Sequence, residues 1–126
     1  MNQLEQAALG PPTGEVAALT AAACLFDGFS DRSRLAIVQH LLQGEHRVVD
    51  LTGHLGLAQS TVIRHLACLL DCGIVQVRAQ GRASLYSLAH REATLALLTA
   101  AEQLLALTGD AVVLCSTYGP TAEDAG

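Results

Sequence analysis

Lysine is absent from this chain of 126 residues, and its seven arginines are outnumbered by twelve acidic residues, which leaves a net charge of −5. Proteins that hold nucleic acid through bulk electrostatics are usually basic, so this composition argues against such a binder. Any contact with DNA must therefore depend on a local group of cations. Arg64, Arg78 and Arg82 fall within nineteen residues in the middle of the chain, which permits a basic face on an acidic protein.

Long hydrophobic runs are also missing. No apolar stretch approaches eighteen residues, and residues 1–30 lack the basic and then apolar layout of a signal peptide, so we expect a cytoplasmic protein without a membrane partner. In a reducing compartment the four cysteines are metal ligands, redox switches or buried packing groups in preference to structural disulfides.

Catalytic patterns are equally scarce. The chain has no Ser/His/Asp or Cys/His pairing with a supporting acid and no glycine-rich phosphate loop, so we predict that it is not an enzyme and has no catalytic residues.

The length and the 51% hydrophobic content predict one small, mainly helical domain. Residues 1–14, with two prolines after Gly10, are expected to form a flexible arm, residues 15–107 the folded domain, and residues 108–126 a tail that ends in a disordered acidic segment. Thr13 is a candidate cap for the first helix. The predicted helices cover about residues 15–27, 31–42, 48–55, 58–71 and 91–107, the second capped by Ser30 or Asp31.

The third and fourth predicted helices are joined by a short turn at Gly56, which is typical of a helix-turn-helix whose second helix enters the DNA major groove. The hydrophobic period then changes from 3.6 to about 2 around a turn at residues 80–82, which predicts a β-hairpin. A helix-turn-helix followed by such a hairpin is a winged helix. The predicted DNA contacts are Gln59, Ser60, Thr61, Arg64, His65, Arg78 and Arg82.

The last predicted helix carries seven apolar side chains, more than a small domain covers easily. Together with the Ala-rich first helix it forms a natural dimer surface, so we expect a homodimer through the first and last helices.

From about residue 27 to residue 88 the chain resembles the ArsR/SmtB family of dimeric, winged-helix, metal-responsive repressors. The resemblance rests on Phe-Ser-Asp-Arg-Ser-Arg-Leu-Ala-Ile-Val at 29–38 and Leu-Gly-Leu-Ala-Gln-Ser-Thr-Val-Ile-Arg-His-Leu at 55–66. It extends to the wing, with Gly-Ile-Val at 73–75 and Gly-Arg-Ala-Ser-Leu-Tyr-Ser-Leu at 81–88. It implies binding to double-stranded, palindromic operator DNA as a homodimer.

The metal site that the resemblance implies depends on the family type. The thiolate site of the third helix, Cys-Val-Cys-Asp-Leu, is replaced here by Arg-Val-Val-Asp-Leu at 47–51, and of the last-helix zinc site only His90 survives. The match is to the cadmium- and lead-sensing CmtR type, in which two cysteines of the recognition helix join one from the C-terminal tail. The corresponding residues are Cys68, Cys72 and Cys115, with Cys24 as a further candidate.

Soft thiolates suit this chemistry, because three sulfur ligands in trigonal geometry favour Cd(II), Pb(II) or As(III) over structural Zn(II). Cys68 and Cys72 share a helix face but point the same way, a poor geometry for a disulfide between them. Cys24 is either a ligand or a packing residue.

Two other functions remain open. One is a thiol redox switch on the same scaffold, and the other is a winged-helix interaction module that binds no DNA. His40, His46 and His54 are expected to be solvated or helix-end residues, and no histidine is predicted to be a metal ligand.

Overall fold

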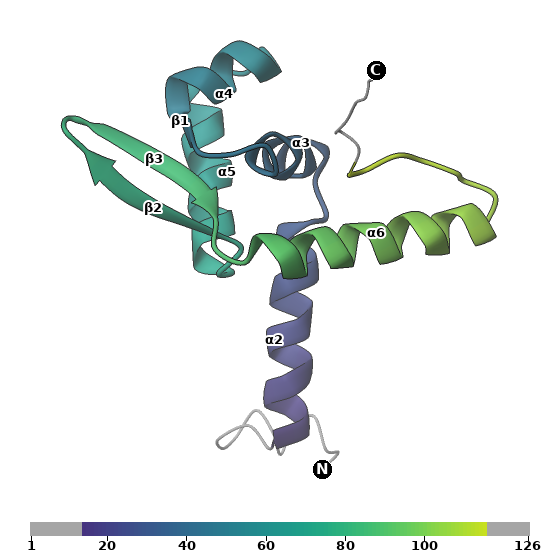
Figure 1. Cartoon of the computed structure of the whole chain (residues 1–126). Helices are drawn as coiled ribbons and strands as arrows, with labels where there is room; N and C mark the ends of the chain where they lie inside the picture. Colours follow the sequence, from purple (N-terminus) through teal and green to yellow (C-terminus); the bar gives the residue numbers. More distant parts are fainter. Residues whose placement is uncertain (1–13, 116–126) are drawn as a thin grey trace.

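The computed structural model describes residues 14–115 (Figure 1). The predicted N-terminal arm, the Thr13 cap and the acidic end of the tail lie outside the described residues, apart from Gly14. The elements in chain order are α2 (Gly14–Gly28), α3 (Arg32–Leu41), β1 (His46–Arg47), α4 (Val48–Leu55), α5 (Gln59–Asp71), β2 (Val75–Gln80), β3 (Ala83–Leu88) and α6 (Arg91–Leu107). The helices agree with the sequence prediction to within a few residues, and they complete a winged helix-turn-helix.

Local hydrogen bonds explain where the central helices begin and end. Asp31, in extended conformation, caps α3 by accepting a hydrogen bond from the Arg34 backbone N–H at 3.0 Å. The α4 helix ends at Gly56, whose φ of 67° lies in the left-handed region that favours glycine. The N–H of Gly56 donates to the carbonyl of Thr52 at 2.9 Å, and α5 begins three residues later. This tight turn sets the angle between the two helices of the DNA-binding motif.

The wing is a hairpin of β2 and β3 with a two-residue turn. The antiparallel register pairs Val75 with Leu88 at its base and Gln80 with Ala83 at its tip, so Arg82 lies in the turn. The structure adds a third strand that the sequence did not predict: β1 pairs with β3, giving the order β1-β3-β2. Two residues are too few to show an alternating pattern, and for that reason β1 had no signal in the sequence.

The core lies between α3, α4, α5 and the base of the sheet. On α5 the buried side chains recur at helical spacing, with Val62, Leu66 and Leu69 fully covered. They pack with the other buried hydrophobic residues: Ile37, Val38, Leu41, Leu42, Leu51, Ile74, Val75, Leu88 and Leu98. This core fixes one face of α5 inward and leaves its opposite face to solvent.

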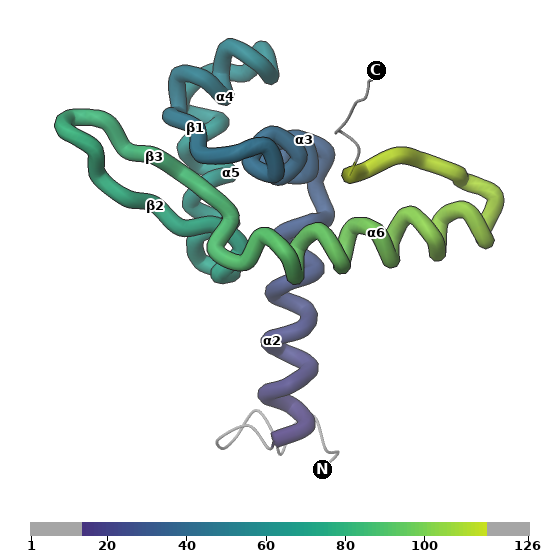
Figure 2. Tube along the Cα trace, viewed as in Figure 1, coloured from purple at the N-terminus to yellow at the C-terminus, as the bar shows by residue number. Residues whose placement is uncertain are grey.

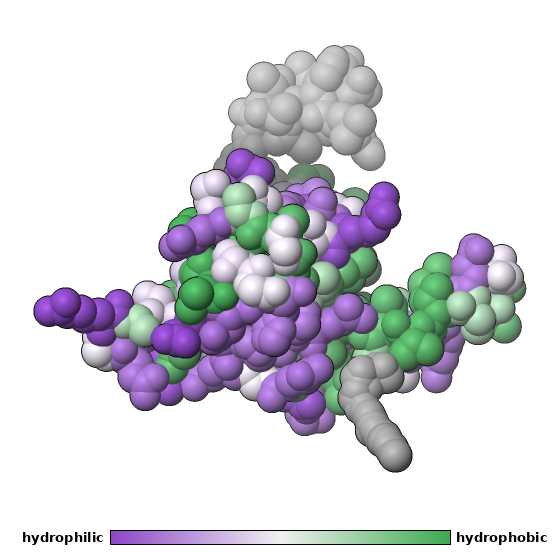
Figure 3. Space-filling model, turned by 90° about the horizontal axis from the view of Figure 1, so that it is seen from above, coloured by the Kyte–Doolittle hydropathy of each residue, from purple (hydrophilic) through white to green (hydrophobic). Residues whose placement is uncertain are grey.

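Two helices project away from that core. In Figure 2, α2 and the far end of α6 extend from the body as separate arms. Their apolar side chains are open to solvent in the single chain: Leu19, Phe26 and Leu104 are exposed, and Leu107 is 85% exposed. Figure 3 shows hydrophobic residues along the arm at the right of the view, which α6 forms together with the segment that follows it. Among the described residues no helix is long and apolar enough to cross a membrane.

Candidate functional site

The outer face of α5 carries four of the five predicted DNA-contacting residues of this helix. Gln59, Ser60 and Arg64 are exposed and Thr61 is half-buried. The buried stripe of the same helix is on the other side, so the start of α5 presents polar side chains and one cation to solvent. This is the arrangement with which a recognition helix reads base edges in the major groove.

The arginines differ in whether their side chains are already paired with an acidic residue. Arg32, Arg64 and Arg82 are exposed and form no hydrogen bond or ion pair with any described residue. Arg78 binds the Glu45 carboxylate through two nitrogens, at 2.7 and 2.8 Å, and this hydrogen bonding lowers the pKa of Glu45. The predicted DNA contact at Arg78 must therefore compete with this ion pair, whereas Arg64 and Arg82 have no internal partner to give up.

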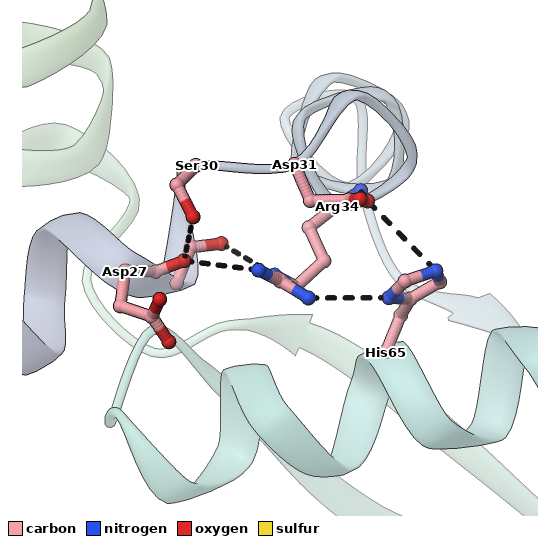
Figure 4. A network of polar contacts seen from close by, with 6 residues as sticks. Asp27, Ser30, Asp31, Arg34 and His65 are labelled. Carbon is pink, nitrogen blue, oxygen red and sulfur yellow. Dashed lines mark hydrogen bonds and ion pairs between the residues drawn. The ribbon is translucent and has the colours of Figure 1, made fainter.

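His65, also predicted as a DNA contact, faces the protein. Its side chain is only 14% exposed, with Nδ1 at 3.4 Å from Arg34 Nη1 and Nε2 at 3.8 Å from Asp31 Oδ2 (Figure 4). Arg34 in turn donates to the carbonyl oxygens of Gly28 and Asp27, both at 3.0 Å. The network joins the end of α2, through Arg34 on α3, to the middle of α5.

A second link between α2 and α5 consists of cysteines. The Sγ atoms of Cys24, on α2, and Cys72, at the end of α5, are 3.2 Å apart, and the Cys72 thiol also lies 3.2 Å from the Cys24 carbonyl oxygen. Burial raises the pKa of Cys72 to about 12, and the neighbouring thiols of Cys24 and Cys68 add to the shift. The structure thus places the thiol of Cys24, the further candidate ligand, beside the end of the helix that carries Cys68 and Cys72.

Gly28 allows this close approach of the two helices. A Cβ placed there would lie 2.6 Å from Ile74 Cδ1 and 3.5 Å from Cys72 Sγ. We expect Gly28→Ala to destabilise the fold by about 1 kcal/mol, because the terminal carbon of the Ile74 side chain must move to make room for the added methyl group. Denaturant unfolding would measure the change, with Gly53→Ala, where the Cβ has open space, as the control. Equal stability of the two variants would contradict the close packing of Gly28.

Cys115 lies elsewhere in this chain. Its N–H and that of Leu114 both donate to Glu102 on α6, the Cys115 bond at 3.0 Å, and Gln39 on α3 donates to the Leu114 carbonyl at 2.9 Å. The Cys115 sulfur lies 3.6 Å from the Thr99 hydroxyl, and burial raises its pKa. None of these partners belongs to the Cys24, Cys68 and Cys72 group. Within residues 14–115, no three His, Cys, Asp or Glu side chains are already arranged to hold a metal ion.

Three histidines that the sequence predicted to be solvated or helix-end residues come together, and two of them, His40 and His46, are half-buried. The rings of His40, His46 and His54 have centroids 4.8 to 6.2 Å apart. These residues come from α3, β1 and α4, so no sequence spacing could have indicated their contact.

Comparison with known proteins places these features in a family. A family model described as "Bacterial regulatory protein, arsR family" matches residues 31–77, which include the whole helix-turn-helix. The probable mercury resistance operon repressor of Streptomyces lividans is 35% identical over 96 residues, covering 75% of this chain and 74% of that protein. The HTH-type transcriptional regulator CmtR of Mycobacterium bovis is 36% identical over 91 residues, covering 72% of this chain and 77% of that protein.

Solved structures give the same result for the fold. The homodimeric winged helix-turn-helix DNA-binding domain Mb0332 of Mycobacterium bovis has a TM-score of 0.66 at 26% identity, covering 77% of this chain and 94% of that one. HlyU of Vibrio cholerae has a TM-score of 0.61 at 29% identity, covering 71% of this chain and 96% of that one.

Proposed function

Since the chain belongs to the ArsR family of bacterial regulatory proteins, we propose that it is a dimeric transcriptional repressor that releases its operator DNA when a soft metal ion binds its cysteines. The family and the solved neighbours consist of DNA-binding regulators and not enzymes. The name of one relative, a probable mercury resistance operon repressor, supports a metal effector, and the similarity to CmtR agrees with the type that the sequence resembles. Cd(II) and Pb(II) are the effectors that we propose; As(III) also suits three sulfur ligands, whereas Zn(II) is a weaker fit to them.

In the proposed dimer, the exposed apolar side chains of α2 and α6 pack against those of a second copy. The homodimeric state of a structural neighbour with the same fold supports this assembly. Two recognition helices related by a two-fold axis would then read the two halves of a palindromic operator. Arg64 on α5 and Arg82 at the tip of the wing supply the cations, because the side chain of neither is paired with another described residue.

The observation that carries the metal proposal is the 3.2 Å contact between Cys24 and Cys72 at the end of the recognition helix. Cys68 lies one helical turn before Cys72 and close enough to raise the pKa of Cys72, so three sulfurs gather at one end of α5. A small rearrangement of flexible side chains would direct them at one ion. The thiolates of Cys68 and Cys72 are the proposed primary ligands, and Cys24 is the proposed addition to them.

Cys115 is the proposed ligand from the tail. In the metal-free arrangement Glu102 and Gln39 hold the segment around it against α6 and α3. To reach the thiols of α5, in its own subunit or in the partner, this segment must leave those hydrogen bonds. Metal binding and tail docking on α6 are therefore alternatives.

The response to metal follows from linkage between two binding events. A metal ion that joins α2 to the end of α5 stabilises one position of the recognition helix relative to the dimer surface. If that position fits the operator poorly, metal and DNA each weaken the binding of the other by the same factor, typically about 5–150-fold. The Arg34–His65 network transmits the same displacement, since it connects the same two helices.

A titration of the reduced protein tests this proposal. Cd(II), Pb(II) and Hg(II) are added to the protein bound to labelled operator DNA, while ultraviolet absorption follows metal–thiolate bonds and fluorescence anisotropy follows DNA release. The proposal requires both signals to change at the same metal concentration. A metal–thiolate band without DNA release, or no band at all, would contradict it.

Metal affinity should depend steeply on pH. Because the pKa of Cys72 is raised to about 12 and that of Cys115 is also raised, both thiols hold their protons in the metal-free protein at neutral pH. Each thiol that binds metal must release its proton, so the apparent affinity for Cd(II) should rise roughly tenfold per pH unit for each thiol, up to that thiol's pKa.

Calorimetry in buffers of different ionisation enthalpy would count the released protons. Cys72→Ser should lower the count by one, because a serine hydroxyl remains protonated. An affinity that does not change between pH 6 and pH 8 would show that these thiols are not the ligands.

The Cys24–Cys72 contact also favours a second candidate function, a repressor that responds to peroxide. Two thiols at 3.2 Å need little movement to form a disulfide, which would tie α2 to α5 as a metal would. Peroxide would then release DNA from metal-free protein, and dithiothreitol would restore binding. If peroxide has no effect on DNA binding, the peroxide-responsive function is rejected and metal sensing is the one remaining candidate.

A further inference from the structure

The histidine cluster, formed by His40, His46 and His54, comes from elements that carry none of the four cysteines. His40 is in the last turn of α3, His46 is in β1, and His54 is in the last turn of α4, two residues before the turn at Gly56. The rings of His40 and His54 are stacked, with centroids 4.8 Å apart and 14° between their planes. His46 meets both at an angle, at 6.2 Å from His40 and 5.8 Å from His54. All three pairs are therefore in contact range.

We infer that the histidine cluster is a second metal site, separate from the cysteines, that takes a borderline divalent cation such as Zn(II), Co(II) or Ni(II). Imidazole nitrogen suits this class of ion, whereas Cd(II) and Pb(II) prefer the thiolates. The inference does not depend on the proposed thiolate sensor, because it uses no cysteine.

The ring separations fit one shared ion. With metal–nitrogen bonds of about 2.0–2.1 Å, the centroid of a bound imidazole lies about 3.2 Å from the metal, so two rings at a tetrahedral angle have centroids about 5.2 Å apart. The three observed separations, 4.8, 5.8 and 6.2 Å, lie on both sides of this value. The rings are not yet turned so that their nitrogens converge, in agreement with the lack of a preformed three-ligand set within residues 14–115. Binding therefore requires rotation of the side chains.

One ring is already held as a metal ligand needs to be. The Nδ1 atom of His46 lies 2.9 Å from the carbonyl oxygen of Gly44. A carbonyl oxygen can only accept, so Nδ1 carries the proton and the lone pair of the neutral ring is on Nε2. Metal-binding histidines almost always donate their second nitrogen in this way, which fixes the tautomer and the orientation of the ring.

The surroundings also favour a neutral ring at His40 and access from solvent to the cluster. Burial lowers the pKa of His40, and the neighbouring rings of His54 and His46 lower it further, so protons do not compete strongly for its nitrogens at neutral pH. Two carboxylates that neighbour the cluster in sequence are paired with arginines, Asp50 with Arg47 and Glu45 with Arg78, and Asp50 also interacts electrostatically with His46. Among the described residues no carboxylate forms a hydrogen bond with the three rings. His54 is exposed and the other two rings are half-buried, so an ion can enter from solvent.

Cobalt titration of the full chain tests the inference. Cys24, Cys68, Cys72 and Cys115 are each changed to Ser, so that only nitrogen and oxygen ligands remain, and circular dichroism checks that the fold is kept. Co(II) should bind at one equivalent per chain, with visible d–d absorption and no thiolate band. His46→Gln and His54→Gln should each weaken this binding by about 10–100-fold or more, while His90→Gln, an exposed histidine outside the cluster, should leave it unchanged.

A second measurement covers the case in which the cysteine-free chain does not fold. Zn(II) is added to the unmodified chain after one equivalent of Cd(II), and nuclear magnetic resonance follows the histidine ring protons. The resonances of His40, His46 and His54 should shift together, and that of His90 should not. No Co(II) or Zn(II) binding, or binding that survives His46→Gln and His54→Gln, overturns the inference. Neither result bears on DNA release by Cd(II), so the thiolate proposal is judged separately.

Discussion

Cys68→Ser is expected to bind operator DNA as tightly as the unmodified protein and to remain bound when Cd(II) is added. Serine is close to cysteine in size, and Cys68 is half-buried on α5 outside the set of exposed residues at the start of that helix, so repression should be kept. The hydroxyl does not ionise at neutral pH and is a poor ligand for a soft ion. In the unmodified protein Cd(II) should lower DNA affinity by about 5–150-fold, and in the variant this factor should fall close to one.

The same outcome is expected for Cys115→Ser if the tail supplies a ligand. Fluorescence anisotropy with labelled operator DNA, with and without Cd(II), measures both variants. Ala67→Ser is the matched control, since Ala67 is exposed on the same helix and the change adds a hydroxyl without removing a thiol. If Cd(II) releases both cysteine variants fully from operator DNA, the thiolate mechanism is refuted. Release of Cys115→Ser alone would assign the site to Cys24, Cys68 and Cys72.

Among the variants proposed for unfolding measurements, Leu66→Ala should lower the free energy of unfolding most, by about 2–5 kcal/mol. Leu66 is 0% exposed on the inner face of α5, where it packs with core residues from α3 and α4. Its truncation leaves a cavity under the recognition helix, and a domain of this size has only about 5–15 kcal/mol of stability in total. We also expect weaker DNA binding, because the core holds α5 in the position that presents Gln59 and Arg64.

Ile63→Ala is the control for this truncation. Ile63 lies three residues earlier on the same helix but is 45% exposed, so its truncation should cost about 1 kcal/mol or less. Urea unfolding of both variants gives the comparison, at a protein concentration high enough to keep the dimer. Similar losses for the two variants would mean that α5 does not bury the face described here.

Much of the fold followed from local patterns. The spacing of Val62, Leu66 and Leu69, the turn at Gly56 and the alternation around Gly81 each depend on neighbouring residues, and the structure confirms the helices and the wing that they predicted. The family followed from the same segments. The metal ligands stay a prediction. Helix spacing had indicated Cys68 and Cys72 as the pair of neighbouring thiols, whereas in the structure the two thiols in contact are those of Cys24 and Cys72.

The sequence by itself determined the order and type of the elements, because helical and strand periods, caps and turns are properties of short segments. Only the tertiary structure decided which side chains meet across elements. It placed Cys24 against Cys72 over 48 residues of chain, turned His65 toward Arg34 and away from solvent, and gathered three histidines from three elements. Such contacts depend on how the core orients each helix, and no local spacing records that orientation.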